Sequence, residues 1–235
     1  MAGKREKRQT TIFLLAFIVL FIASIIACVV RAKRMQKVEY ADHMEDVAVT
    51  VDGEPYTFRD IAFYLAHKEQ TTQEQAKVYD LEHTNEFWNL HTNGSFIRIE
   101  AKDTAMDMAV HDVIFYRMAE EEELSLSEDE KQYVENKADD FWNDLEEEGQ
   151  KRLGVSKGEI DDTFIHMGLA QKAQQLLADT NGVDYREYNV EGSMYQDVLD
   201  EHTYKINEKL WKRLDFGNII LDSRLKKDVS KNRKK

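Results

Sequence analysis

The sequence predicts a mainly α-helical protein, in which an N-terminal transmembrane helix precedes a helical domain closed by a small β-sheet. Three observations lead to this prediction. Residues 12–30 form one uncharged, largely apolar run. Four Ser/Thr-x-x-Asp/Glu signals each precede an amphipathic stretch, as the capping boxes of helices do. Finally, the 235 residues include one proline and ten glycines, which disfavours a turn-rich all-β fold.

The apolar run of residues 12–30 has the length of a membrane span. Its 19 residues would measure about 28 Å as a helix, close to the thickness of a bilayer's hydrocarbon core. Four basic residues precede the run and four follow it, so the positive-inside rule does not orient it. We expect residues 1–11 to be a basic cytoplasmic tail and residues 31–46 a polar stalk. The large domain would then lie outside the plasma membrane.

The single cysteine, Cys28, opens a second interpretation of this run. The sequence Ile25-Ile26-Ala27-Cys28 resembles a bacterial lipobox, at which a signal is cleaved and the cysteine lipidated. Against it, apolar residues continue beyond Cys28 to the basic cluster, which favours an uncleaved span. Cys28 is otherwise a small apolar residue in a helix. A lone cysteine also excludes an internal disulfide.

The folded domain is expected to begin with a strand. Valines alternate with other residues over Val47–Val51, the period of a half-buried strand. Residues 52–55, Asp-Gly-Glu-Pro, predict a turn, and Tyr56 and Thr57 a short return strand. Thr57 then starts the first helix of the domain.

Helices are predicted over most of the remaining chain. A long helix is expected from Phe96 to Leu124, the next to stop near Gly149, and another to end at Asn181-Gly182. The four capping signals are Thr57/Asp60, Thr71/Glu74, Ser127/Glu130 and Ser156/Glu159.

The C-terminal part of the domain is expected to return to the sheet. A short helix is predicted within Tyr204–Leu214, followed by a β-branched stretch at Phe216–Leu221 that is too short for a helix. An isolated strand leaves its backbone groups unpaired, so we expect it to pair with Val47–Val51. The domain then spans residues 47–221, and residues 222–235 form a basic, disordered tail.

Charge and motifs restrict the possible functions. Residues 38–223 carry 17 basic against 43 acidic side chains, a charge that would repel a phosphate backbone, so we predict no nucleic-acid partner. The chain has no HExxH, P-loop, GxGxxG or GxSxG motif. We therefore predict no catalytic residue, no metal ligand, no cofactor and no enzymatic activity, although spacing alone leaves open a metal site assembled across helices.

Two acidic runs, residues 120–123 and 146–148, are interpreted mainly as solvated ends of helices. The alternative is a contact surface for a basic partner or a cation. Continuous helical acids do not have the spaced oxygens of a calcium loop.

Aromatic and methionine side chains are the remaining candidates for binding a partner. Most must form the core, but a minority are expected to line an open groove between helices, where flat rings and flexible methionines accept varied apolar segments. Trp142, adjacent to Phe141 and so pointing about 100° away, is a reasonable candidate for exposure. The peptide-binding candidates are Phe63, Trp88, Phe115, Met118, Phe141, Trp142 and Met167.

The order of these parts resembles the SurA/PrsA type of extracytoplasmic chaperone, specifically its non-catalytic N-terminal helical domain. Residues 47–57, Val-Ala-Val-Thr-Val-Asp-Gly-Glu-Pro-Tyr-Thr, are similar to that family's opening strand and turn, and a helix follows. Further similarity lies in the Phe87-Trp88 pair, the Asn93-Gly94 turn, residues 118–130 and residues 209–217. The resemblance covers residues 47–221.

The resemblance implies a membrane-anchored extracytoplasmic chaperone-like protein that binds unfolded or newly exported polypeptides. The family often carries a parvulin prolyl-isomerase domain, for which this chain has neither the length nor the sequence, so no catalysis is carried over. Two alternatives stay open: an envelope scaffold that recognises one folded partner, and a foldase related to the prolyl isomerases.

Overall fold

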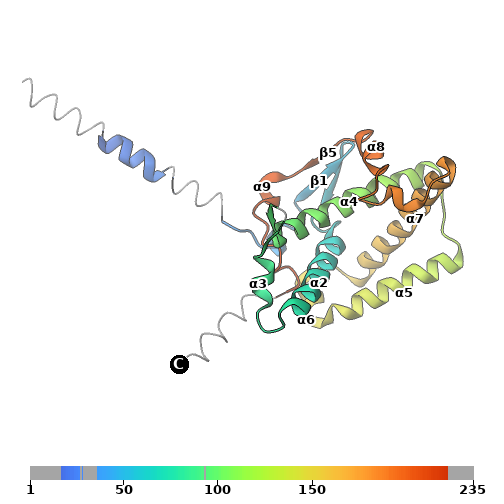
Figure 1. Ribbon diagram of the computed structural model, residues 1–235, viewed down its shortest axis with the longest axis horizontal. Coiled ribbons are helices and arrows are strands. Elements are labelled where there is room, and N and C mark those ends of the chain that lie inside the picture. The colour runs from blue at the N-terminus through green and yellow to red at the C-terminus, as the bar shows by residue number, and fades with distance from the viewer. Residues whose placement is uncertain (1–16, 27, 29–35, 93, 222–235) are drawn as a thin grey trace, which may run out of the picture. The chain divides into compact units, whose positions relative to one another are not determined.

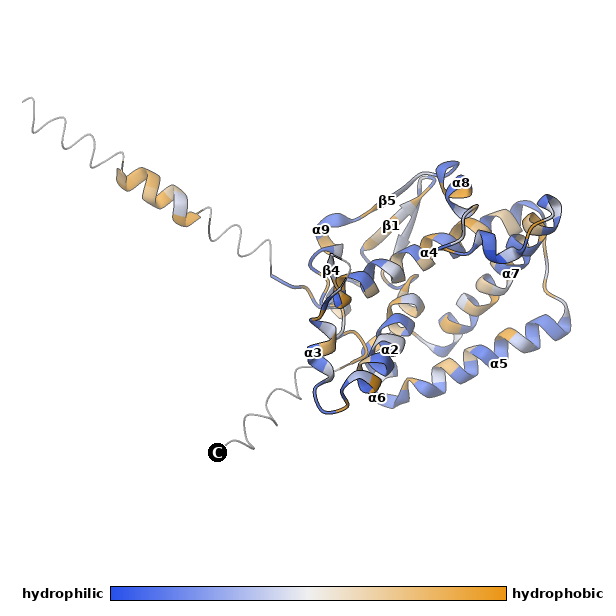
Figure 2. Cartoon of the chain, in the orientation of Figure 1, coloured by the Kyte–Doolittle hydropathy of each residue, from blue (hydrophilic) through white to orange (hydrophobic). Residues whose placement is uncertain are grey.

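The computed structural model describes residues 17–26, 28, 36–92 and 94–221. The chain divides into two units, residues 1–38 and residues 39–235. In the first unit, residues 17–26 are helical, and Figure 2 shows their strongly apolar character. Among the residues described, no helix combines the length and apolarity needed to cross a bilayer. The predicted span at residues 12–30 lies partly outside the described residues.

Other predictions for the chain ends also concern residues outside the described ranges. The predicted tails at residues 1–11 and 222–235 lie wholly outside them, as does the first part of the stalk, up to residue 35. Cys28, the alternative lipidation site, is described and is exposed on a helical stretch.

The second unit is mainly helical and includes a small antiparallel sheet, as predicted (Figure 1). Helix α4 contacts α2, α7 and strand β1, and α7 lies between α4 and α5. The α-helices are α2 (Ala62–Tyr79), α3 (Thr84–Trp88), α4 (Ile97–Glu121), α5 (Glu128–Asp144), α6 (Glu146–Leu153), α7 (Lys157–Asn181), α8 (Tyr195–Asp200) and α9 (Glu208–Trp211). Two 3-10 helices, η1 (Tyr40–His43) and η2 (Tyr185–Tyr188), complete the helical elements.

The three-stranded sheet joins the two ends of the unit. Its strands are β1 (Val47–Val51), β2 (Glu54–Thr57) and β5 (Tyr204–Ile206), in the order β2-β1-β5 and all antiparallel. A separate hairpin pairs β3 (His91–Thr92) with β4 (Ser95–Phe96). The predicted pairing of an N-terminal with a C-terminal strand is therefore confirmed, but the C-terminal partner is β5, not Phe216–Leu221.

The prediction of a strand at Phe216–Leu221 was wrong because a buried carboxylate and a half-buried guanidinium bind its backbone. The carboxylate of Glu69 on α2 accepts N–H bonds from Gly217, Ile219 (3.0 Å) and Ile220 (2.9 Å). On the acceptor side, the Arg152 guanidinium donates to the carbonyls of Asn218 and Leu221, each at 2.8 Å, and of Ile219 at 3.3 Å. Since these groups are satisfied without a ladder, the segment needs no neighbouring strand.

The same segment, with the preceding Leu214 and Asp215, completes the core of the unit. Residues 214–220 are all buried. Phe216 lies edge-on to Trp88, with ring centroids 6.1 Å apart. Gly217 adopts a positive φ of 91°, and a Cβ there would lie 3.5 Å from the Trp88 ring. Glycine is thus required by the backbone conformation at this turn.

Two of the four capping signals start helices as predicted. Ser127/Glu130 and Ser156/Glu159 form complete capping boxes at the starts of α5 and α7. Thr57 and Asp60 also bond each other reciprocally, but they close a turn and do not start the helix, because α2 begins at Ala62. Helix α7 ends at Asn181, with Gly182 as its cap, as predicted.

Two further helix boundaries differ from the predictions. Thr71 does not start a helix: it lies inside α2, where its hydroxyl donates to the carbonyl of Lys68. Gly149 does not end one either, because it lies within α6, and the break comes earlier, at Leu145. In both cases the local pattern also suits a helix interior, and tertiary packing decides between the two.

Candidate binding groove

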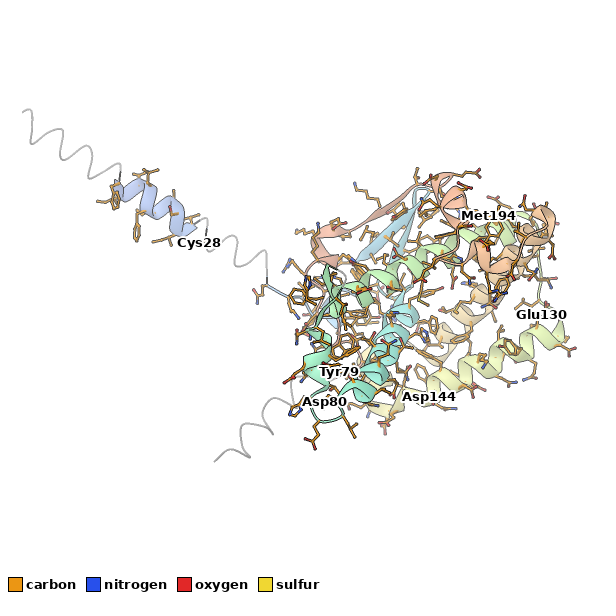
Figure 3. The ribbon with its side chains drawn as sticks, in the orientation of Figure 1. Cys28, Tyr79, Asp80, Glu130, Asp144 and Met194 are labelled. Carbon is orange, nitrogen blue, oxygen red and sulfur yellow. The ribbon has the colours of Figure 1, made fainter. Side chains whose placement is uncertain are left out.

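A groove about 650 Å³ in volume lies along α5 and α7 and is closed at one end by the loop between α4 and α5. We call it the α5–α7 groove. In Figure 3, Glu130 and Asp144 are labelled toward the two ends of α5, and the groove lies toward the Glu130 end. Its lining residues are Leu124, Leu126, Asp129, Glu130, Tyr133, Val134, Gly168, Gln171, Lys172, Gln175, Leu176 and Asp179.

Gly168 allows α5 and α7 to approach closely in the groove. A Cβ at this position would lie 2.9 Å from Cγ1 of Val134 and 3.2 Å from Cδ1 of Leu126. Real Cβ contacts are longer, so any larger residue would push α7 away from its neighbours. Val134 and Leu126 are themselves buried, and with Gly168 they form the floor of the groove.

The walls of the groove expose apolar side chains that the core does not use. Tyr133 on α5 is 61% exposed and Leu176 on α7 is 41% exposed. Leu124, in the loop, is half-buried. Figure 2 shows that much of α5 is hydrophilic. Exposed large side chains that meet across a hollow are typical of binding surfaces.

Polar contacts of Lys172 join helix α7 to α5 and to the loop at one end of the groove. The Lys172 ammonium lies 2.8 Å from Oε2 of Glu130 and donates to the carbonyl of Ser125 at 2.9 Å. Glu130 also accepts the backbone N–H of Ser127 at 2.7 Å. The hydrogen bonds from Lys172, and after them those from Ser127, lower the pKa of Glu130 to about 2. The carboxylate therefore stays ionised, and the contact stays formed, throughout the neutral range.

The seven candidates predicted from the sequence do not line this groove. Phe63, Trp88, Phe115 and Phe141 are buried, and Met118, Trp142 and Met167 are half-buried against the core. Phe63 and Phe141 pack edge to face with centroids 4.9 Å apart, whereas Phe115 lies in a second cluster with Tyr195. Trp142, which we expected to be exposed, packs against the core, and its carbonyl accepts from Gln150.

The groove was missed although Val134 and Leu176 belong to the spaced apolar residues that predict these two helices. Helical periodicity marks apolar residues, but it does not show which of them the neighbouring helices leave uncovered. Tyr133 was not among the spaced apolar residues. The available signal was the pair of leucines in Leu124-Ser-Leu126-Ser, which are apolar residues in a loop.

A second, smaller hollow of about 300 Å³ lies where the start of α2 meets α4 and α7. The Tyr64 hydroxyl donates to Asp112 at 3.0 Å, and the His166 ring lies over Tyr116 with centroids 4.1 Å apart. Arg59 pairs with Glu159 at 3.0 Å and with Glu45 at 2.7 Å. These polar groups satisfy one another, which is typical of a structural network.

The described part of the chain contains no group of three or more His, Cys, Asp or Glu side chains placed to hold a metal ion. Burial lowers the pKa of His166 and of His67, so neither is favoured as a cation at neutral pH.

Comparison with known proteins assigns no family to this fold. No protein-family model matches the chain, and neither the curated proteins nor the solved structures compared with it yield a match.

Proposed function

We propose that the protein is a membrane-anchored, extracytoplasmic chaperone-like protein, which binds unfolded or newly exported polypeptides without catalysis. Residues 12–30 would be the anchor. The observation that supports the proposal is the α5–α7 groove, where Tyr133 and Leu176 expose apolar surface beside a floor of buried side chains. The sequence resemblance to the SurA/PrsA type supports it independently.

The size of the groove suits weak, reversible binding. Burying one side chain the size of leucine contributes about 1.5–3 kcal/mol. A dissociation constant of 1 µM needs about 8 kcal/mol after the costs of association. One or two anchor residues therefore hold a client only briefly, and tethering at a membrane would compensate by raising the local concentration.

The test is suppression of aggregation by the full chain in lipid nanodiscs, with a reduced, unfolded model protein as client. At several-fold excess we expect the wild-type chain to suppress aggregation. Leu176→Asp places a charge in the groove and should remove about half of the effect or more, because central apolar anchors dominate such contacts.

Leu81→Asp is the matched control. Leu81 is 73% exposed beyond the end of α2 and does not line the groove, so this variant should keep wild-type activity. An inactive wild-type chain, or equal losses in both variants, would contradict the proposal. Capture of one strong folded partner in place of many clients would favour the scaffold alternative.

A further inference from the structure

The rim of the α5–α7 groove is acidic. Asp129 and Asp179 line it, both are exposed, and neither forms a described ion pair. Residues 121–123, three exposed glutamates, lead directly into Leu124 at the end of the groove. Carboxylates thus lie on both helices and at the loop.

The basic groups nearby are already engaged. Lys172, the one lysine among the lining residues, binds Glu130 and the Ser125 carbonyl. Lys131 pairs with Glu128 at 3.0 Å. Lys137 does not line the groove, and its ammonium lies 5.7 Å from the centroid of the Tyr133 ring. Neither Asp129 nor Asp179 is paired with these cations. Gln175 donates to one oxygen of Asp179 at 2.7 Å, and the charge of both carboxylates remains without a described cation to neutralise it.

We infer that the groove takes polypeptide segments in which apolar side chains are flanked by lysine or arginine. The inference rests on the proposed function and specifies its ligand. The apolar side chain of such a segment would lie between Tyr133 and Leu176, and the flanking cations would face Asp129 and Asp179. Guanidinium and ammonium groups are the complement of exposed carboxylates, and this pairing selects among ligands as well as attracting them.

The expected selectivity is modest. Exposed ion pairs are weak because water and salt screen them, so two contacts together should change affinity about 5- to 10-fold. The same screening makes the effect sensitive to salt, whereas burial of the apolar side chain is not weakened by salt.

The experiment measures binding of three labelled peptides to the full chain in nanodiscs of neutral phosphatidylcholine. The peptides share their apolar residues and differ only in flanking lysines, glutamines or glutamates. We expect the lysine peptide to bind about 5- to 10-fold more tightly than the glutamine peptide, and the glutamate peptide to bind most weakly. The difference should largely vanish in about 1 M salt.

Two variants locate the effect. Asp129→Asn with Asp179→Asn should bring the lysine and glutamine peptides within about 2-fold of each other. Asp140→Asn with Glu148→Gln removes the same charge from exposed residues outside the groove and should keep the wild-type ratio.

The outcomes separate the inference from the proposed function. Equal affinities for all three peptides, still reduced by Leu176→Asp, would overturn the inference and leave the function intact. Absence of binding by any peptide would overturn both. Concentration-dependent dimers that Leu176→Asp abolishes would overturn the inference by assigning the groove to a second copy of the chain.

Discussion

The C-terminal segment, residues 214–220, and the α5–α7 groove differ in how far their side chains are buried and in how their backbone groups are hydrogen-bonded. Every residue of the segment is buried, whereas the groove leaves Tyr133 and Leu176 exposed. The segment is irregular, so its backbone must find partners elsewhere, and it does so in Glu69 and Arg152. The groove is formed largely by helices, which satisfy their own backbone groups. A hollow between helices therefore leaves no backbone group unpaired. It loses only the free energy of burying some apolar surface, so the fold can keep it open.

The largest expected change in the free energy of unfolding concerns the C-terminal segment. Glu69→Ala would leave several buried N–H groups without an acceptor, which costs about 3–5 kcal/mol of unfolding free energy. Denaturant unfolding of the full chain measures it. Glu74→Ala is the matched control on the same helix, because Glu74 is exposed and pairs only with Lys77 at the surface. A loss below about 1 kcal/mol at Glu69 would mean that the segment is held by its apolar side chains alone.

The second largest expected effect is a pH dependence of the unfolding free energy that arises from Glu69. Burial raises the pKa of Glu69 from 4.5 to about 7, and four backbone N–H groups that donate to its carboxylate act in the opposite direction: those of Ile219, Ile220, Gly217 and Leu221. Since the folded-state pKa lies above the unfolded one, this group's contribution to stability is complete below pH 4.5 and is lost as pH rises through 7. Between pH 5 and 8 the loss should be about 2–3 kcal/mol.

Glu69→Gln isolates this effect because glutamine does not titrate. The difference in unfolding free energy between wild type and Glu69→Gln should decline from pH 5 to pH 8. A constant difference would show that Glu69 does not change its charge in this range. In the groove, Glu130 has a pKa of about 2, so its contact with Lys172 should not change over the same interval.

The smallest expected change in stability concerns the start of α5, which forms one wall of the α5–α7 groove. Ser127→Ala removes the side-chain half of the capping box at the start of α5 and should cost about 1 kcal/mol. Hydrogen exchange at residues 128–131 should accelerate in the variant. Ser125→Ala is the control, because Lys172 binds the backbone carbonyl of Ser125, which alanine keeps. Equal costs in the two variants would argue against a role for the cap in holding the wall.

Local signals predicted well those parts of the fold that depend on local physics. The capping boxes at Ser127 and Ser156, the turn after Val51 and the end of α7 all follow from hydrogen bonds or conformations within a few residues. Thr71 shows the limit of this reasoning. Its spacing to Glu74 satisfies the capping pattern, but packing of α2 against α4 continues the helix through it.

The site was less predictable than the fold. Amphipathic spacing marked Phe141 as part of an apolar face, and Phe63 was a binding candidate as an aromatic residue, but both side chains are buried and reach no surface. Which apolar residues remain exposed depends on how many neighbours cover each helix. Helix α7 contacts both α4 and α5, yet Leu176 on α7 is left 41% exposed.

The amino-acid sequence by itself determined the helical character of this protein, its capped helix ends, its acidic body and the pairing of β1 with its hairpin, because these depend on near neighbours and composition. The tertiary structure alone decided that Tyr204–Ile206, not Phe216–Leu221, pairs with β1 and that the open apolar surface lies between α5 and α7. Both outcomes depend on residues such as Glu69 and Gly168, which contact residues distant in the sequence. A local sequence pattern contains no information about such long-range contacts.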